Sequence, residues 1–134
     1  MRFYISSKLD NCEQVKKLAG LLSLSGWEHT YDWTVHIAEK IIDVETLKSI
    51  GRMDCDGVKN ADIVIVLTPE GRGTHVELGM ALVLNKVVYI CHEDDKYFRC
   101  DENTSAFYWH QNVNHFVGSV EELAERLRTV YGQR

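Results

Sequence analysis

The sequence has little that would hold it in a membrane or keep it unfolded. It contains no repeats, low-complexity tracts or linkers, and no apolar run approaches the length that crosses a bilayer. Its first residues, MRFYISSKLD, have a short strand pattern rather than the pattern of a signal peptide. These absences predict a single domain over residues 1–134 that is cytoplasmic and has no membrane partner.

Positive charge is also scarce, and it is scattered along the chain. There are 15 lysine and arginine residues against 20 aspartate and glutamate residues, which gives a formal net charge of -5 at pH 7. Proteins that bind nucleic acid rely on clustered lysine and arginine side chains to neutralise phosphates. The charge pattern therefore argues against nucleic acid as a partner.

Cysteine occurs four times but never at the spacing of a metal site. Neither the cysteines nor the histidines near them fall at the separations that zinc ligands show; the cysteines are Cys12, Cys55, Cys91 and Cys100. In a reducing compartment such cysteines are free thiols. We therefore expect no metal ion and no cofactor.

The composition is otherwise that of an ordinary globular domain, with 45% hydrophobic and 26% charged residues. Apolar runs predict strands over residues 2–6, 27–33, 63–67, 87–91 and 113–117. A 3.6-residue period predicts helices from residue 10 to a stop at Gly26, over 35–50 with a break at Gly51, over 53–60, from residue 74 onward, and over 120–131. Residues 97–111 are aromatic without a clean period, and we interpret them as a partly helical cover.

Strands that alternate with helices indicate an α/β fold. Runs such as IVIVL over residues 63–67 lack polar alternation, which is typical of parallel strands covered on both faces. We predict a five-stranded, mainly parallel sheet in the order 2-1-3-4-5 with helices on both faces, a three-layer sandwich of flavodoxin-like or Rossmann-like type. Ligands of such folds bind beyond the strand ends, where the strand order reverses.

The most informative stretch is ADIVIVLTPEGRGTHVELGMALVL, residues 61–84. An apolar strand leads into a loop in which Pro69 ends the strand and two glycines, Gly71 and Gly73, permit a tight turn and close approach to a ligand. We expect Thr74 to be the N-cap of the next helix. A strand, glycine loop and helix in this order form a unit that holds anions and small ligands on free backbone N–H groups.

Glu77 has two interpretations. The Thr74-x-x-Glu77 spacing is that of a capping box, in which Glu77 would only satisfy free N–H groups at the helix start. Alternatively, the helix dipole keeps Glu77 ionised at the mouth of a ligand cleft, where it serves as a nucleophile. The two interpretations differ in what removal of the carboxylate does to activity.

The predicted topology brings further polar residues to the same edge of the sheet. The first strand ends in Ser6, Ser7 and Lys8, and the loop from Thr68 to Gly73 follows the neighbouring strand. Trp33, at the end of the second predicted strand, either stacks on a base or caps the core.

These residues also carry a resemblance. The run ADIVIVLTPEGRGTHVELGMALVLNKVVYI is similar to the core motif of the nucleoside 2-deoxyribosyltransferase family, in which an apolar strand and a glycine-rich loop precede a helix with E-L-G-x-A. The opening FYISS resembles the I-Y-x-A-S of that family, which includes related deoxynucleoside monophosphate N-glycosidases. The resemblance implies an enzyme that forms a homodimer and acts on a nucleoside or nucleotide.

The resemblance implies roles for individual residues. Glu77 matches the glutamate nucleophile that attacks the anomeric carbon, and Asp54 matches the aspartate that helps to protonate the leaving base. Tyr4 resembles the tyrosine that hydrogen-bonds the nucleophile, and Ser7 would lie near the 5′ end of the sugar. A retaining displacement needs an ionised carboxylate and a proton donor, so these roles form a coherent mechanism.

The substrate loop departs from the family pattern. Six residues before the glutamate, the transferases have an aspartate for the sugar 5′-hydroxyl and the monophosphate hydrolases have a serine for the phosphate, whereas this chain has Gly71. Arg72, Lys8 and Ser7, together with the loop N–H groups, can receive a phosphate in its place. Arg72 is otherwise a solvated loop tip.

The sequence thus predicts an enzyme that cleaves or transfers an N-glycosidic bond through Glu77. Two alternatives remain open: a non-catalytic module that senses or binds a nucleotide, and a TIR-like NAD hydrolase, whose domains also place a glutamate on a helix after a strand.

Overall fold

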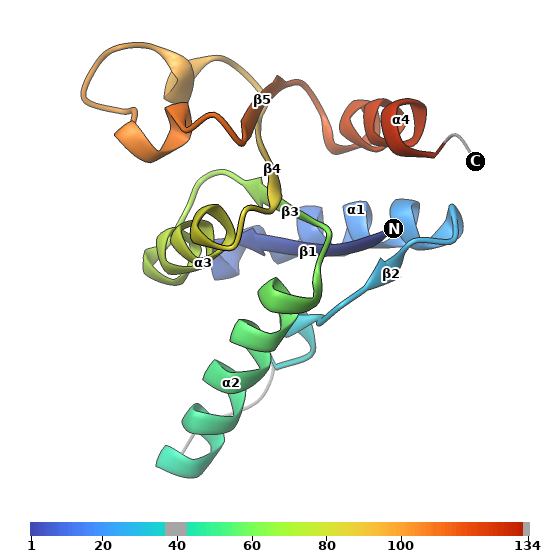
Figure 1. Cartoon of the computed structure of the whole chain (residues 1–134), viewed down its shortest axis with the longest axis vertical. Helices are drawn as coiled ribbons and strands as arrows, with labels where there is room; N and C mark the ends of the chain where they lie inside the picture. Colours follow the sequence, from blue (N-terminus) through green and yellow to red (C-terminus); the bar gives the residue numbers. More distant parts are fainter. Residues whose placement is uncertain (37–42, 133–134) are drawn as a thin grey trace.

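The computed structural model describes residues 1–36 and 43–132. Five parallel strands form one sheet in the order β2-β1-β3-β4-β5, which confirms the predicted fold class and strand order (Figure 1). The strands are β1 (Arg2–Ser7), β2 (Glu28–His29), β3 (Ile63–Leu67), β4 (Val87–His92) and β5 (Val113–Val117).

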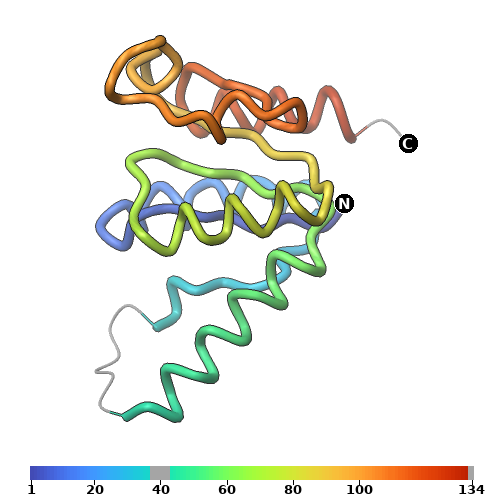
Figure 2. Tube along the Cα trace, turned by 60° about the vertical axis from the view of Figure 1, so that its left-hand side comes forward, coloured from blue at the N-terminus to red at the C-terminus, as the bar shows by residue number. Residues whose placement is uncertain are grey.

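Helices cover both faces of the sheet. One face carries α1 (Cys12–Leu24) and α4 (Val120–Tyr131), and the other carries α2 (Val44–Asn60) and α3 (Arg72–Val83). Figures 1 and 2 both show α2 projecting away from the sheet, with its N-terminal end farthest from the rest of the molecule. No helix in the described part of the chain combines the length and apolar character needed to cross a membrane.

The core lies on the three inner strands, β1, β3 and β4. All five residues of β3 are buried, because helices pack on both sides of this strand, and the apolar run IVIVL matches that environment. In β1, residues 3–6 are buried as well, and they include the polar side chains of Tyr4 and Ser6. Buried polar groups need partners, so these two side chains indicate an internal polar site.

The prediction of a strand over residues 27–33 was wrong in extent. Pairing covers only Glu28–His29, after which the chain turns into a 3-10 helix, η2 (Trp33–His36). The turn is stabilised by Asp32, whose carboxylate accepts hydrogen bonds from the backbone N–H and the hydroxyl of Thr34. Such local side-chain bonds compete with strand pairing.

The predicted break at Gly51 was also wrong, because α2 runs without interruption from Val44 to Asn60. The helix begins at Asp43, whose side chain accepts a hydrogen bond from the backbone N–H of Thr46 at 2.7 Å. A single glycine costs only about 1 kcal/mol in a helix, which continued apolar packing to Val58 offsets. The earlier part of the predicted helix, over 37–42, lies outside the described residues.

The other predicted elements agree with the structure, except that the helix predicted from residue 74 begins at Arg72. A 3-10 helix, η1 (Leu9–Asn11), precedes α1, and Gly26 follows that helix with a positive φ of 84°. Residues 97–111 contain parts of η3 (Lys96–Phe98) and all of η4 (Ala106–Trp109), which confirms a partly helical segment. In both figures this segment lies beside β5.

Candidate active site

A cavity of about 750 Å³ opens at the carboxyl ends of β1 and β3. Eight of the residues predicted for the site line it: Ser7, Lys8, Trp33, Asp54, Gly71, Arg72, Gly73 and Glu77. They come from β1, η2, α2 and the start of α3, elements that lie far apart in the sequence. The strand order places the ends of β1 and β3 side by side, which is where α/β folds bind ligands.

Glu77 is held by two hydroxyl groups from β1. The Tyr4 hydroxyl donates a hydrogen bond to Glu77 Oε2 at 2.6 Å, and the Ser6 hydroxyl donates to Oε1. Tyr4 and Ser6 are both fully buried and do not line the cavity, so the two donors contact Glu77 from the protein interior. Each carboxylate oxygen has a fixed donor, and this fixes the orientation of the carboxylate.

The capping-box interpretation of Glu77 was wrong. Helix α3 begins one turn earlier than expected, with Gly71 rather than Thr74 as its N-cap. Thr74 is the third residue of the helix, and its hydroxyl accepts a hydrogen bond from the backbone N–H of Gly71 at 3.0 Å. Glu77 therefore lies in the second turn, and its carboxylate has no role in capping the helix.

Burial, rather than the helix dipole, dominates the electrostatics of Glu77. It raises the pKa of the carboxyl group from its ordinary 4.5 to about 7, and the nearby Asp54 charge adds to this effect. The hydrogen bonds from Ser6 and Tyr4 act in the opposite direction and lower the pKa. The expectation that the helix start keeps Glu77 fully ionised is thus wrong, and the carboxyl group titrates near neutral pH.

Asp54 is the second carboxyl group of the site. Its Oδ1 lies 3.4 Å from the Tyr4 hydroxyl, so one tyrosine touches both acidic groups. Burial raises the pKa of Asp54. The hydrogen bond from Tyr4 and the charge of His36 lower the pKa, but by less than burial raises it. Both carboxyl groups are therefore shifted toward holding a proton.

Close packing of α2 on β1 brings Asp54 to this position. A Cβ atom at Gly57, three residues after Asp54, would lie 2.8 Å from two ring atoms of Tyr4. Only glycine leaves room for the Tyr4 ring at this point of the helix.

Two cationic residues, Lys8 and Arg72, also line the cavity, together with the acidic Asp10. Lys8 follows β1, and Arg72 is the first residue of α3; both side chains line the cavity and are exposed. The backbone N–H of Lys8 donates to the carbonyl of Pro69 at 3.3 Å, which joins the two loops. The free backbone N–H groups at the start of α3 lie beside these two cations. Together they form a surface that can bind an anion.

Ser7 and Trp33 line the cavity, and each side chain also forms hydrogen bonds to other parts of the protein. The Ser7 hydroxyl donates to the Leu67 carbonyl at 2.6 Å and accepts a hydrogen bond from the Asn11 amide at 2.9 Å. The indole N–H of Trp33 donates to the Ile5 carbonyl at 2.7 Å, and the residue is only 9% exposed. Trp33 therefore caps the core and at the same time gives the cavity an aromatic wall.

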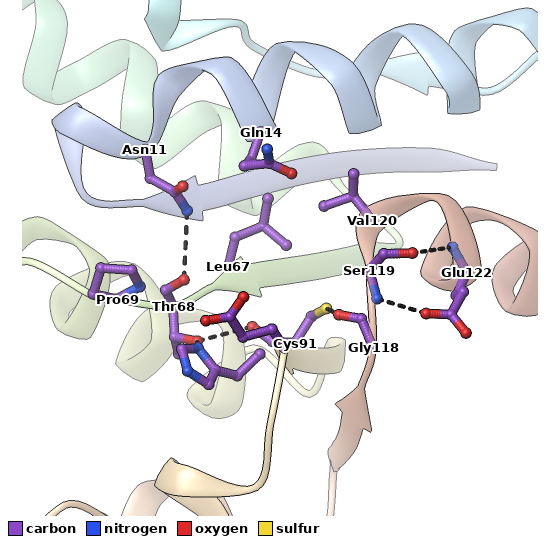
Figure 3. Close-up of a pocket in the computed structure, with 12 residues that line it drawn as sticks. Asn11, Gln14, Leu67, Thr68, Pro69, Cys91, Gly118, Ser119, Val120 and Glu122 are labelled. Carbon is purple, nitrogen blue, oxygen red and sulfur yellow. Dashed lines mark hydrogen bonds between the residues drawn. The ribbon is translucent and has the colours of Figure 1, made fainter.

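Thr68 lies outside this cavity. Its hydroxyl donates to the Cys91 carbonyl at 3.0 Å and contacts His92, on the side of β4. There it borders a separate cavity of about 450 Å³, between the starts of α1 and α4 (Figure 3). Near this second cavity, His92, Glu93 and Asp94 each offer one atom that could ligate a metal ion, and these three atoms lie within 4.8 Å of one another. None of the three residues lines the main cavity.

Sequence reasoning missed five residues that line the main cavity: Leu9, Asp10, His36, Ile50 and Thr74, the last of which was expected only as a helix cap. His36 reaches the site only because the chain turns after β2, and Ile50 because α2 continues through Gly51. A pattern of apolar spacing does not reveal either feature.

The sequence matches the family model described as nucleoside 2-deoxyribosyltransferase over residues 3–124. The chain belongs to the nucleoside 2-deoxyribosyltransferase family. Within this family motif, Glu77 stands in the E-L-G-x-A run at the start of α3.

Solved structures share the fold of this family member. The structure of Clostridium botulinum CMP N-glycosidase, BcmB, is similar with a TM-score of 0.64 and 19% sequence identity, over 95% of this chain and 98% of that chain. A conserved protein from Enterococcus faecalis V583 is similar with a TM-score of 0.57 and 17% identity, over 97% of this chain and 98% of that chain. No curated protein sequence matches the chain.

Proposed function

We propose that this member of the nucleoside 2-deoxyribosyltransferase family cleaves or transfers the N-glycosidic bond of a nucleoside 5′-monophosphate, with Glu77 as the nucleophile. One observation carries the proposal: the Glu77 carboxylate lies at the wall of a cavity and is oriented by Tyr4 and Ser6, with Asp54 beside it. A carboxylate that only capped a helix would bond to backbone N–H groups instead.

In the first step, ionised Glu77 attacks the anomeric carbon of the sugar and the bond to the base breaks. The electron pair of that bond leaves with the base, and the product on the protein is a glycosyl ester of Glu77. Tyr4 and Ser6 fix the two oxygens of the carboxylate, so the attacking oxygen needs little reorientation.

Asp54 supplies the proton that the departing base requires. Burial raises its pKa, which makes the protonated form more accessible than it is in water, and the Tyr4 oxygen, 3.4 Å away, can accept a hydrogen bond from that form. In the form of the pair that reacts, Asp54 holds the one proton and Glu77 is ionised. Water or a second base then attacks the glycosyl ester and frees Glu77.

The charge at the cavity supports a phosphorylated substrate. Lys8 and Arg72 lie beside the start of α3, at a loop where Gly71 replaces both the transferases' aspartate for a free 5′-hydroxyl and the hydrolases' serine for the phosphate. A phosphate with two negative charges fits two cations and free backbone N–H groups better than a hydroxyl does. Trp33 and Ile50 provide apolar surface for the base.

Product analysis tests this function. Purified protein is incubated separately with nucleosides, their 5′-monophosphates and NAD, with and without a free acceptor base, and products are identified by chromatography and mass spectrometry. We expect base release or exchange from a 5′-monophosphate that disappears in Glu77→Gln. Inactivity of the wild type on every substrate would leave a nucleotide-binding module, and release of nicotinamide alone would indicate an NAD hydrolase.

A further inference from the structure

Three side chains meet on the side of the glycine loop that faces away from the main cavity. They are Glu70, just before the N-cap of α3; His75, in the first turns of α3; and Tyr108, in η4. We refer to them as the loop-anchoring cluster. The Tyr108 hydroxyl lies 2.9 Å from His75 Nε2, and Glu70 Oε1 lies 3.9 Å from the same nitrogen.

The cluster is buried on the Tyr108 side and reaches solvent at His75. Tyr108 is 2% exposed, whereas the side chain of His75 is 48% exposed. Glu70 Oε2 is buried and has no hydrogen-bond partner among residues 1–36 and 43–132. The pKa of Tyr108 is raised, first by burial and then by the charge of Glu70 and a hydrogen bond to it.

One arrangement of protons satisfies these contacts. The Nε2 proton of His75 is donated to the Tyr108 oxygen, which leaves the Tyr108 hydroxyl proton directed toward the nearby carboxylate of Glu70. A negative charge attracts a hydroxyl proton, so the partly buried carboxylate of Glu70 selects this direction.

Tyr108 is itself held firmly by the segment that covers this end of the sheet. Its backbone carbonyl accepts a hydrogen bond from His115 Nε2 at 2.6 Å. The His115 ring stacks on Phe98 at 4.2 Å between centroids and meets Trp109 edge-on at 4.7 Å. The cluster therefore ties the glycine loop to a rigid aromatic group in η3, η4 and β5.

The same short segment of chain lines the main cavity from its other side. Gly71, Arg72 and Gly73 lie between Glu70 and His75, and all three border the cavity. Glu77, by contrast, is held independently by Tyr4 and Ser6. Displacement of the loop would move residues 71–73 while leaving the nucleophile in its place.

We propose that Glu70, His75 and Tyr108 are positioning residues that set the geometry of the loop 71–73 for the phosphate of the substrate. The inference rests on the proposed function for the identity of the anion. The loop-anchoring cluster thus strengthens substrate binding, whereas Glu77 and Asp54 carry out the step that breaks the bond.

The variants Tyr108→Phe, Glu70→Gln and His75→Leu each remove one link, while His75→Gln keeps a neutral N–H donor of similar reach. Tyr89→Phe is the matched control, because it removes a buried hydroxyl that contacts Tyr131 on the opposite side of the sheet. Kinetics use a nucleoside 5′-monophosphate and the corresponding nucleoside. Binding is followed separately by the amide signals of Gly71 and Gly73 in ¹⁵N-labelled protein titrated with inorganic phosphate.

We expect the three disruptive variants to raise the KM for the monophosphate roughly fivefold to tenfold with kcat within about twofold of wild type, because each removes a hydrogen bond or a charged contact within the cluster. The KM for the nucleoside changes little, phosphate binding weakens in parallel, and His75→Gln restores both. Unchanged phosphate shifts in the variants, or no shift in the wild type, would overturn the inference. Phosphate shifts in a wild type that releases no base would refute the proposed function alone.

Discussion

At the scale of single residues, Glu77 shows burial and hydrogen bonding acting in opposite directions on one carboxyl group. Burial raises its pKa to about 7, although Tyr4 and Ser6 both stabilise the ionised form. A nucleophile of this kind is desolvated but oriented. A carboxylate in water is fully ionised at neutral pH, yet it is solvated and free to rotate.

The first prediction concerns pH. Because Glu77 must be ionised to attack and its pKa is about 7, the value of kcat/KM should fall as pH drops below 7, approaching tenfold per pH unit. Steady-state rates of base release from pH 5 to 8 measure this limb. A rate that is constant from pH 5 to 7 would contradict a buried glutamate nucleophile.

The second prediction separates Asp54 from another carboxylate on the same helix. Asp54→Asn should lower kcat by about 10²- to 10⁴-fold, because the amide cannot donate an acidic proton to the leaving base. Asp56→Asn is the control, since Asp56 is exposed and does not line the cavity. Equal rates in the two variants would remove Asp54 from the mechanism.

The site residues were predictable from sequence only in part. Glu77, Asp54 and Tyr4 were found because they stand in motifs that resemble those of the family, and the structure brings the three together. The role of Ser6 as a direct partner of Glu77 follows from strand register, which is not visible before the sheet is built. The placement of Thr68 toward β4 depends on which way one side chain points at a strand end.

At the scale of elements, α2 positions the acid and α3 positions the nucleophile. The sequence predicted two helices, over 35–50 and 53–60, where α2 continues through Gly51, because Gly51 was interpreted as a stop. Glycine has a different role at each of its two positions in this helix. A Cβ atom at Gly51 would meet nothing within 4 Å, whereas one at Gly57 would collide with Tyr4.

The third prediction follows from this difference. Gly57→Ala should destabilise the fold by about 1–3 kcal/mol and lower activity, because the added methyl group must displace the Tyr4 ring or the helix. Gly51→Ala should instead stabilise it by about 0.5–1 kcal/mol through helix propensity. Urea unfolding with parallel activity assays compares the two, and a larger loss for Gly51→Ala would refute the packing argument.

At the scale of the whole molecule, strand order was the most predictable property. Alternating apolar strands and amphipathic helices, with short connections, leave few topologies, and the order 2-1-3-4-5 is the simplest of them. The projection of α2 from the body was not predictable, since it depends on how far the helix extends beyond its contacts with α3 (Figure 2).

The fourth prediction concerns assembly. Family resemblance implies a homodimer, and the projecting end of α2 exposes Val44 and Leu47, which are 64% and 54% exposed. We expect light scattering after gel filtration to give twice the chain mass, and Leu47→Asp to shift it toward a monomer. Leu24→Asp, at a still more exposed site on α1 (87%), should have no effect. A monomeric wild type, or a dimer that only the α1 variant dissociates, would contradict the prediction that the end of α2 forms the dimer interface.

The covalent intermediate on Glu77 provides the most direct test of the account. Intact-protein mass spectrometry after a rapid acid quench of wild type turning over a 5′-monophosphate should show an added sugar phosphate. Peptide mapping should place that mass on Glu77, and Glu77→Gln should show neither the adduct nor base release. Base release by Glu77→Gln at the wild-type rate would contradict the central claim that this buried carboxylate forms the bond to the sugar.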